Sequence, residues 1–203
     1  MASILVVCTG NICRSPLAEG FLRRALQERF GQDAPDVASA GTIGWEGSPA
    51  VAESIEAAAE RNTDIRSHTA SRLEPEQIIP AALVLGMTTE HRDSVAAMVP
   101  QAADRAFSLK EIVRILEDLP PVESVSSSME ALTSRVIQAA AHRRAGFSGN
   151  PHDEDIVDPL GMPAETFRAV AWEIDTLCED LVRGLFGEAS TVTASLSEEE
   201  AGI

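Results

Sequence analysis

The sequence has no long apolar run and few basic residues. No apolar stretch in its 203 residues approaches the length of a membrane-spanning helix, and the N-terminus lacks the pattern of a secretory signal peptide. Lys and Arg together number 16 against 32 Asp and Glu, which gives a formal net charge of −16 at pH 7. Nucleic acids and anionic membranes attract positive charge, so we expect neither as a partner, and no membrane insertion.

Cysteine is also scarce. The chain has three cysteines, Cys8, Cys13 and Cys178, which are too few and too unevenly spaced for a disulfide scaffold. No Cys/His cluster has the spacing of metal ligands, so we expect no metal and no other cofactor. This cysteine usage predicts a reducing, cytoplasmic environment.

Short apolar runs alternate with longer periodic segments, which is typical of a parallel α/β sheet. Strands are expected near residues 4–7, 37–39, 82–87 and 105–109, and helices near residues 16–30, 49–61, 88–98, 109–116, 127–144 and 163–187. The basic triplet at 142–144 falls in a last helical turn, where cations favour the helix dipole, and it indicates helix-end electrostatics rather than a binding patch. We expect one domain over residues 1–187 and a disordered acidic tail over 188–203.

The most informative segment is C-T-G-N-I-C-R at residues 8–14, followed by Ser15-Pro16. It lies between a buried strand and a helix, for which Ser15 is predicted as N-cap and Pro16 as part of the first turn. A loop that turns into the positive end of a helix binds anions, and Arg14 adds a planar fork for oxyanions. The positive electrostatic field of the helix end and Arg14 is expected to hold Cys8 as the nucleophilic thiolate. The segment therefore predicts phosphoryl transfer through a phosphocysteine. A C-x5-R spacing alone also arises by chance around a core cysteine, but here the strand, turn, arginine and helix start agree in order.

These residues resemble the low-molecular-weight protein tyrosine phosphatases. The similarity covers most of the chain and comprises V-V-C-T-G-N-I-C-R-S-P-L-A-E at 6–19, S-A-G-T at 39–42, Trp45, His68, and D-P-L-G at 158–161. It implies a single α/β domain with a four-stranded parallel sheet and helices on both faces. It also implies hydrolysis of phosphotyrosine in a phosphorylated protein substrate, with a tyrosine kinase as a candidate partner. The oligomeric state stays open.

The resemblance also implies the site residues. Cys8 is the expected nucleophile, Arg14 clamps the phosphoryl oxygens, and Asp158 protonates the leaving oxygen and then activates water. From the residues alone, Asp158 fits a turn equally well, because Asp-Pro pairs often begin turns. The implied substrate-binding residues are Thr9, Gly10, Asn11, Ile12, Cys13, Ser15 and Trp45. Asn11 and Ser15 are also expected to join Ser39 and His68 in a supporting hydrogen-bond network.

Two features depart from the family. An aromatic residue, often Tyr, usually follows the Asp-Pro pair, whereas this chain has Leu160 and contains no Tyr, which leaves Trp45 as the candidate aromatic at the rim. The segment at about 120–155 is longer than the family needs. We expect a helical insertion there, before the loop that carries Asp158. The insertion is expected to act as a lid or a protein-docking surface, or to be a tolerated addition.

Several alternatives remain open on the same scaffold. At the position of Ile12, tyrosine-directed members of the family carry Ile, whereas protein-arginine phosphatases carry Thr. Ile12 therefore favours phosphotyrosine as the substrate. Thiol-dependent arsenate reductases need further cysteines to relay electrons. Cys178 falls within a predicted apolar helix and is expected to be buried, which disfavours this alternative. Cys13 is interpreted either as a small buried hydrophobe or as a thiol that rescues oxidised Cys8 as a disulfide. A non-catalytic phosphoprotein-binding module would be expected to lose Cys8, Arg14 or Asp158. All three are present, which favours an enzyme.

Overall fold

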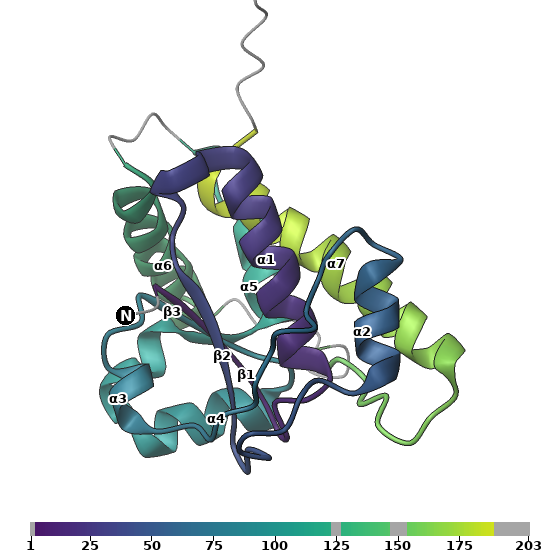
Figure 1. Ribbon diagram of the computed structural model, residues 1–203. Coiled ribbons are helices and arrows are strands. Elements are labelled where there is room, and N and C mark those ends of the chain that lie inside the picture. Colours follow the sequence, from purple (N-terminus) through teal and green to yellow (C-terminus); the bar gives the residue numbers. More distant parts are fainter. Residues whose placement is uncertain (1–2, 123–126, 147–153, 189–203) are drawn as a thin grey trace, which may run out of the picture.

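The computed structural model describes residues 3–122, 127–146 and 154–188. A parallel four-stranded sheet in the order β2-β1-β3-β4 lies between two layers of helices, so the predicted fold class is confirmed (Figure 1). The strands are β1 (Ile4–Cys8), β2 (Val37–Gly41), β3 (Leu83–Gly86) and β4 (Ala106–Ser108). The α-helices are α1 (Arg14–Phe30), α2 (Ala52–Ala59), α3 (Pro75–Ile78), α4 (Thr89–Met98), α5 (Leu109–Asp118), α6 (Ser128–Arg144) and α7 (Ala164–Phe186). The short helix α3 was not predicted.

Strand β1 is buried on both of its faces. Ile4, Val6 and Cys8 face the larger core, with residues of α1, α5, α6 and α7, whereas Leu5 and Val7 face a smaller core with residues of α3 and α4. A strand covered on both sides reads as a continuous apolar run, as this one does. The parallel register pairs Cys8 with Gly41, so the residues that follow both strands meet at the carboxyl edge of the sheet.

Helix α1 begins at Arg14, one residue before the predicted cap. Cys13 is the N-cap residue, so the prediction of Ser15 as N-cap is wrong. The Ser15 hydroxyl lies within hydrogen-bond distance of Cys8 Sγ and of Asn11 Nδ2, and it is therefore committed to the loop instead of a backbone N–H of the first turn. At the other end, Gly31 adopts a φ of 56° and ends the helix as predicted.

Helix α6 occupies the middle of the segment predicted as an insertion. Ser127 caps it by accepting a hydrogen bond from Glu130 N. Its apolar face is buried against the larger core and consists of Leu132, Val136, Ala139 and Ala140. The predicted acidic tail, apart from Glu188, and much of the loop before Asp158 lie outside the described residues.

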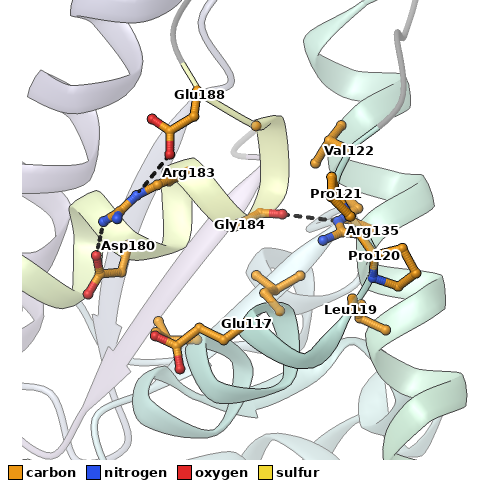
Figure 2. Close-up of a pocket in the computed structure, with 13 residues that line it drawn as sticks. Glu117, Leu119, Pro120, Pro121, Val122, Arg135, Asp180, Arg183, Gly184 and Glu188 are labelled. Atoms are coloured by element: carbon orange, nitrogen blue, oxygen red, sulfur yellow. Dashed lines mark hydrogen bonds and ion pairs between the residues drawn. The ribbon is translucent and has the colours of Figure 1, made fainter.

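A cavity of about 410 Å³ lies where α5, α6 and the end of α7 meet (Figure 2). Arg135 of α6 is buried there and donates hydrogen bonds to the carbonyls of Gly184 and Pro120, both at 3.0 Å. A guanidinium suits this position because the carboxyl end of a helix carries partial negative charge. On the other wall, Arg183 pairs with Asp180 and Glu188. The Arg135 contacts fasten α6 to α7 and to the segment after α5, and we assign the polar groups of the cavity a structural role.

In the described part of the chain, every helix is too short or too polar to cross a membrane.

Candidate active site

The loop from Cys8 to Arg14 curls from the end of β1 into the start of α1. Its carbonyl groups accept hydrogen bonds from outside the loop: Cys8 O from Thr42 N, Thr9 O from Ile43 N and Gly44 N, Gly10 O from Trp45 N, Asn11 O from His68 Nε2, and Ile12 O from Val51 N, all at 2.8–3.1 Å. Because peptide units are planar, outward carbonyls turn the following N–H groups inward. Asn11 N–H donates in this way to Cys8 Sγ at 3.2 Å. The loop is therefore an anion cradle with a cysteine sulfur at its floor.

Asn11 holds the centre of this loop in a left-handed conformation, with a φ of 58°. Its Nδ2 donates to Ser15 Oγ and to Ser39 Oγ, each at 2.8 Å. Both hydroxyls therefore accept from Asn11 and keep their own hydrogens for other partners. Ser39 donates to Glu19 Oε2 at 2.5 Å, and Ser15 is left to donate to Cys8 Sγ at 2.9 Å. The network thus directs a hydrogen-bond donor at the sulfur of Cys8.

Two contacts fix how Asn11 is oriented. Ser71 N–H donates to Asn11 Oδ1 at 2.9 Å, so the amide nitrogen must face the two serine hydroxyls. His68 Nε2 lies 2.8 Å from Asn11 O, and it donates because a carbonyl only accepts. Ser39 and His68 thus join Asn11 in a single hydrogen-bond network.

Arg14 and Asp158 meet across the mouth of the loop. Arg14 Nη2 lies 2.5 Å from Asp158 Oδ2, and Nη1 donates to Ile156 O at 3.0 Å. The Arg14 side chain is only 5% exposed, whereas that of Asp158 is 47% exposed. Arg14 Nε is buried without a hydrogen-bond partner among the described residues. A buried N–H left unpaired is costly, and an oxyanion in the cradle would satisfy it.

The rim of the loop carries exposed apolar side chains. Ile43 and Trp45 belong to the segment whose backbone is bonded to the loop, and Trp45 is 49% exposed. Leu160, whose N–H donates to Asp158 Oδ1, is also exposed. Ile12 differs from them because its side chain is 3% exposed and packs beside Gly10, so it supports the loop from within.

The other two cysteines are both free and buried. Burial, and then the charge of Asp158, raise the pKa of Cys13 to about 12, which keeps it a neutral thiol. Its role in rescuing oxidised Cys8 stays a prediction. Cys178 is completely buried in α7, and burial raises its pKa well above the ordinary value, which does not suit a relay thiol.

His91 is a site residue that the sequence did not indicate. It is 4% exposed at the start of α4, with Nε2 3.0 Å from Thr9 Oγ1 and Nδ1 2.7 Å from Thr88 Oγ1. Burial, and then the positive charge of Arg14, lower its pKa to about 4, so the ring is neutral at pH 7. The signal was its position after β3, because β3 ends beside β1 at the same edge of the sheet.

Fold and site together define an α/β protein with a cysteine-centred phosphate loop, and the comparisons with known proteins agree. The family model "Low molecular weight phosphotyrosine protein phosphatase" matches residues 3–120. The protein-arginine-phosphatase of Geobacillus stearothermophilus is 33% identical over 182 residues, which cover 90% of this chain and 95% of that protein. The low molecular weight protein-tyrosine-phosphatase Etp of Escherichia coli K12 is 39% identical over 105 residues, 52% of this chain and 67% of that protein.

Solved structures give the same result. YwlE arginine phosphatase from Geobacillus stearothermophilus has a TM-score of 0.65 at 32% identity, over 90% of this chain and 91% of that chain. The low molecular weight protein tyrosine phosphatase from T. tengcongensis has a TM-score of 0.65 at 32% identity, over 90% and 99%. The chain therefore belongs to the low molecular weight protein tyrosine phosphatases, a family of cysteine-dependent phosphatases, as predicted.

The closeness of β2 to the phosphate loop gives a first prediction. A Cβ on Gly41 would lie 2.7 Å from Thr9 O and 3.0 Å from Asn11 N, and both are backbone atoms of the loop. We expect Gly41→Ala to displace the loop, to weaken binding of inorganic phosphate at least tenfold, and to destabilise the fold by about 1–3 kcal/mol. Phosphate binding by calorimetry and urea unfolding measure the two effects. Gly31→Ala is the control, because Gly31 has a positive φ with open space around it. Gly31→Ala should lose stability but keep its affinity for phosphate. If Gly31→Ala and Gly41→Ala lost phosphate affinity equally, the prediction would be contradicted.

The buried His91 predicts a specific dependence of stability on pH. The pKa of His91 is lowered from 6.5 to about 4, so between these values the unfolded chain binds a proton that the folded chain excludes. The contribution of neutral His91 to the free energy of unfolding is therefore complete above pH 6.5. It is lost as the pH falls toward 4, by about 3 kcal/mol in total. Urea unfolding at several pH values should show a flatter dependence for His91→Gln than for the wild type. Parallel curves for the two proteins would contradict it.

Proposed function

We propose that this protein hydrolyses phosphotyrosine in phosphorylated proteins, with Cys8 as the nucleophile and Asp158 as the general acid. The observation that carries the proposal is the convergence of three groups on one loop. Cys8 Sγ lies at the floor of the anion cradle, Arg14 has an unpaired buried Nε, and Asp158 approaches the same arginine from the other side. Nucleophile, oxyanion clamp and proton donor are the groups that transfer of a phosphoryl group from an ester requires.

Binding of substrate starts with an exchange of partners at Arg14. The phosphoryl oxygens accept hydrogen bonds from the inward N–H groups of the loop and from Arg14, and they take the place of the Asp158 carboxylate. The acid is thereby released from its ion pair when it is needed.

Two displacements at phosphorus then complete the reaction. The Cys8 thiolate attacks phosphorus, the bond to the ester oxygen breaks, and Asp158 gives its proton to the departing phenolate. In the second step, the Asp158 carboxylate accepts a proton from a water molecule as this attacks the phosphocysteine. The sulfur–phosphorus bond breaks, phosphate is released, and the Ser15 hydroxyl donates to the returning thiolate.

The leaving group is proposed to be a phenol because of the rim. Trp45, whose N–H is bonded to Gly10 of the loop, and Leu160, whose N–H is bonded to Asp158, both present exposed apolar surface, which suits a flat aromatic ring. Protein-arginine phosphatase is the second candidate, and the relative from Geobacillus stearothermophilus, matched over 90% of this chain, supports it. Ile12 favours the tyrosine-directed activity.

The setting of the enzyme is part of the same proposal. A phosphorylated protein is its substrate and a tyrosine kinase its opposing enzyme, in a reducing cytoplasm that keeps Cys8 from being oxidised. We take residues 1–187 as the phosphatase domain, with residues 120–155 as an insertion within it.

Two substitutions test the chemistry. Cys8→Ser should abolish turnover of p-nitrophenyl phosphate in the absence of added metal. Asp158→Asn should lower kcat by about 10²–10⁴-fold with little change in KM, because the general acid is lost. It should also strengthen inhibition by inorganic phosphate, since Asp158 competes with phosphate for Arg14. Glu165→Gln, a change in the first turn of α7, is the control. A near-normal kcat for Asp158→Asn would reassign the acid, with Asp155 and Asp153, which lies outside the described residues, as the next candidates.

The preference for the phosphoryl group is tested at Ile12. Because arginine-directed members carry Thr here, Ile12→Thr is expected to shift the ratio of kcat/KM toward phosphoarginine, by about tenfold. The ratio is measured on phosphotyrosine and phosphoarginine peptides of one sequence, with Ile12→Val as a control that keeps an apolar branched side chain. A wild-type enzyme that prefers phosphoarginine would overturn the proposed substrate.

A further inference from the structure

The segment that carries Asp158 is fastened to the sheet just before the acid. Ile156 N donates to Met87 O at 2.9 Å at the end of β3, and the Ile156 side chain is 1% exposed. Asp155 Oδ1 accepts from Thr89 N at 2.7 Å, in the first turn of α4. These contacts hold residues 155 and 156 against the body of the protein.

Glu154 adds an ion-pair anchor to this segment. Its side chain is only 9% exposed, and Oε1 lies 2.7 Å from Arg114 Nη2 of α5. Its Oε2 lies 3.9 Å from Arg92 Nη1 of α4. Burying a carboxylate is expensive unless opposite charges surround it, and two guanidinium groups from different helices do so here. The proposed reaction uses none of these three residues.

The anchor continues into α6. Arg92 Nη1 lies 3.3 Å from Glu111 Oε2, and Glu111 Oε1 lies 3.6 Å from Arg143 Nη1. Arg143 itself is fixed, because it donates to Ala106 O at 2.8 Å and its guanidinium lies 4.2 Å from the centre of the Phe107 ring. Glu154 is thus attached to a cluster that spans α4, α5 and α6, and not to a single mobile side chain.

Phosphate binding makes this anchor important. Substrate takes the place of Asp158 on Arg14, so the acid loses its own ion pair when it must be held beside the leaving oxygen. The segment then depends on its attachments before residue 158. Little freedom lies between them and the acid, since Asp158 is two residues beyond Ile156 and Pro159 restricts its backbone.

We propose that Glu154, held by Arg114 and Arg92, is a positioning residue that keeps Asp158 in place to protonate the leaving group. The proposal rests on the role of Asp158 in the proposed function. The helix inserted before the segment contributes through Arg143, which ties the same cluster to β4.

The test measures how strongly the rate depends on the leaving group. A misplaced acid slows departure of phenolate from phenyl phosphate more than departure of nitrophenolate from p-nitrophenyl phosphate, because the more acidic phenol leaves without a proton. For Glu154→Gln we expect kcat/KM to fall about tenfold more on phenyl phosphate than on p-nitrophenyl phosphate. Inhibition by inorganic phosphate should stay near the wild-type value, because the phosphate loop is untouched.

Matched variants separate positioning from general damage. Arg114→Gln should reproduce the selective loss with Glu154 still present, and Arg114→Lys should recover part of it; these variants also carry the test if Glu154→Gln does not fold. Glu60→Gln removes a surface ion pair with Arg168 and should change neither rate.

The outcomes distinguish this inference from the proposed function. Equal losses on both substrates, or no loss, for folded Glu154→Gln and Arg114→Gln would overturn the positioning role. If Asp158→Asn itself loses activity equally on both substrates, the assignment of Asp158 as the acid fails, and the proposed function is what must be revised.

Discussion

The site depends above all on the direction of the peptide units between Cys8 and Arg14. A loop with inward N–H groups is unfavourable by itself, since its carbonyls must find donors elsewhere and its dipoles converge. Here the donors come from the Thr42–Trp45 segment, from Val51 and from His68. The sheet brings them there, because β1 and β2 run parallel and end together at Cys8 and Gly41. The fold therefore creates the anion site before any ligand binds.

This local positive site works against the charge of the whole molecule. With a net charge of −16, the protein repels anions at long range, and its attraction for phosphate rests on backbone dipoles and on Arg14. The Arg14–Asp158 ion pair balances the buried guanidinium within the protein. In the proposed mechanism, phosphate and Asp158 carry the same sign and use the same partner, so one replaces the other without leaving Arg14 unpaired. By that mechanism, a single buried arginine links substrate binding to release of the proposed acid.

The part of the site that is contiguous in sequence was predictable. The loop, the strand before it and the helix after it follow from a short apolar run, Gly10, and residues that favour a helix start. The details that failed depend on competition between partners. Ser15 is a good capping residue in isolation, but Asn11 and Cys8 engage its hydroxyl, so the helix begins at Arg14 without it. The family resemblance, rather than residue patterning, indicated Asp158, because nothing local distinguishes it from an Asp-Pro turn.

The sequence analysis missed His91 and Glu154 because their significance is created by packing. His91 reaches Thr9 only because β3 lies beside β1, and Glu154 becomes a buried anchor only where α4 and α5 bring their arginines together. The family model ends at residue 120, yet the chain resumes its contact with the phosphate loop at Ile156 and Asp158. Between these points α6 packs on α5 and α7, and its Arg143 donates a hydrogen bond to Ala106 O of β4. The returning segment is consequently held by the same helices that cover the sheet. Through Arg143 and Glu111, α6 thus contacts the same ion-pair cluster that holds Glu154.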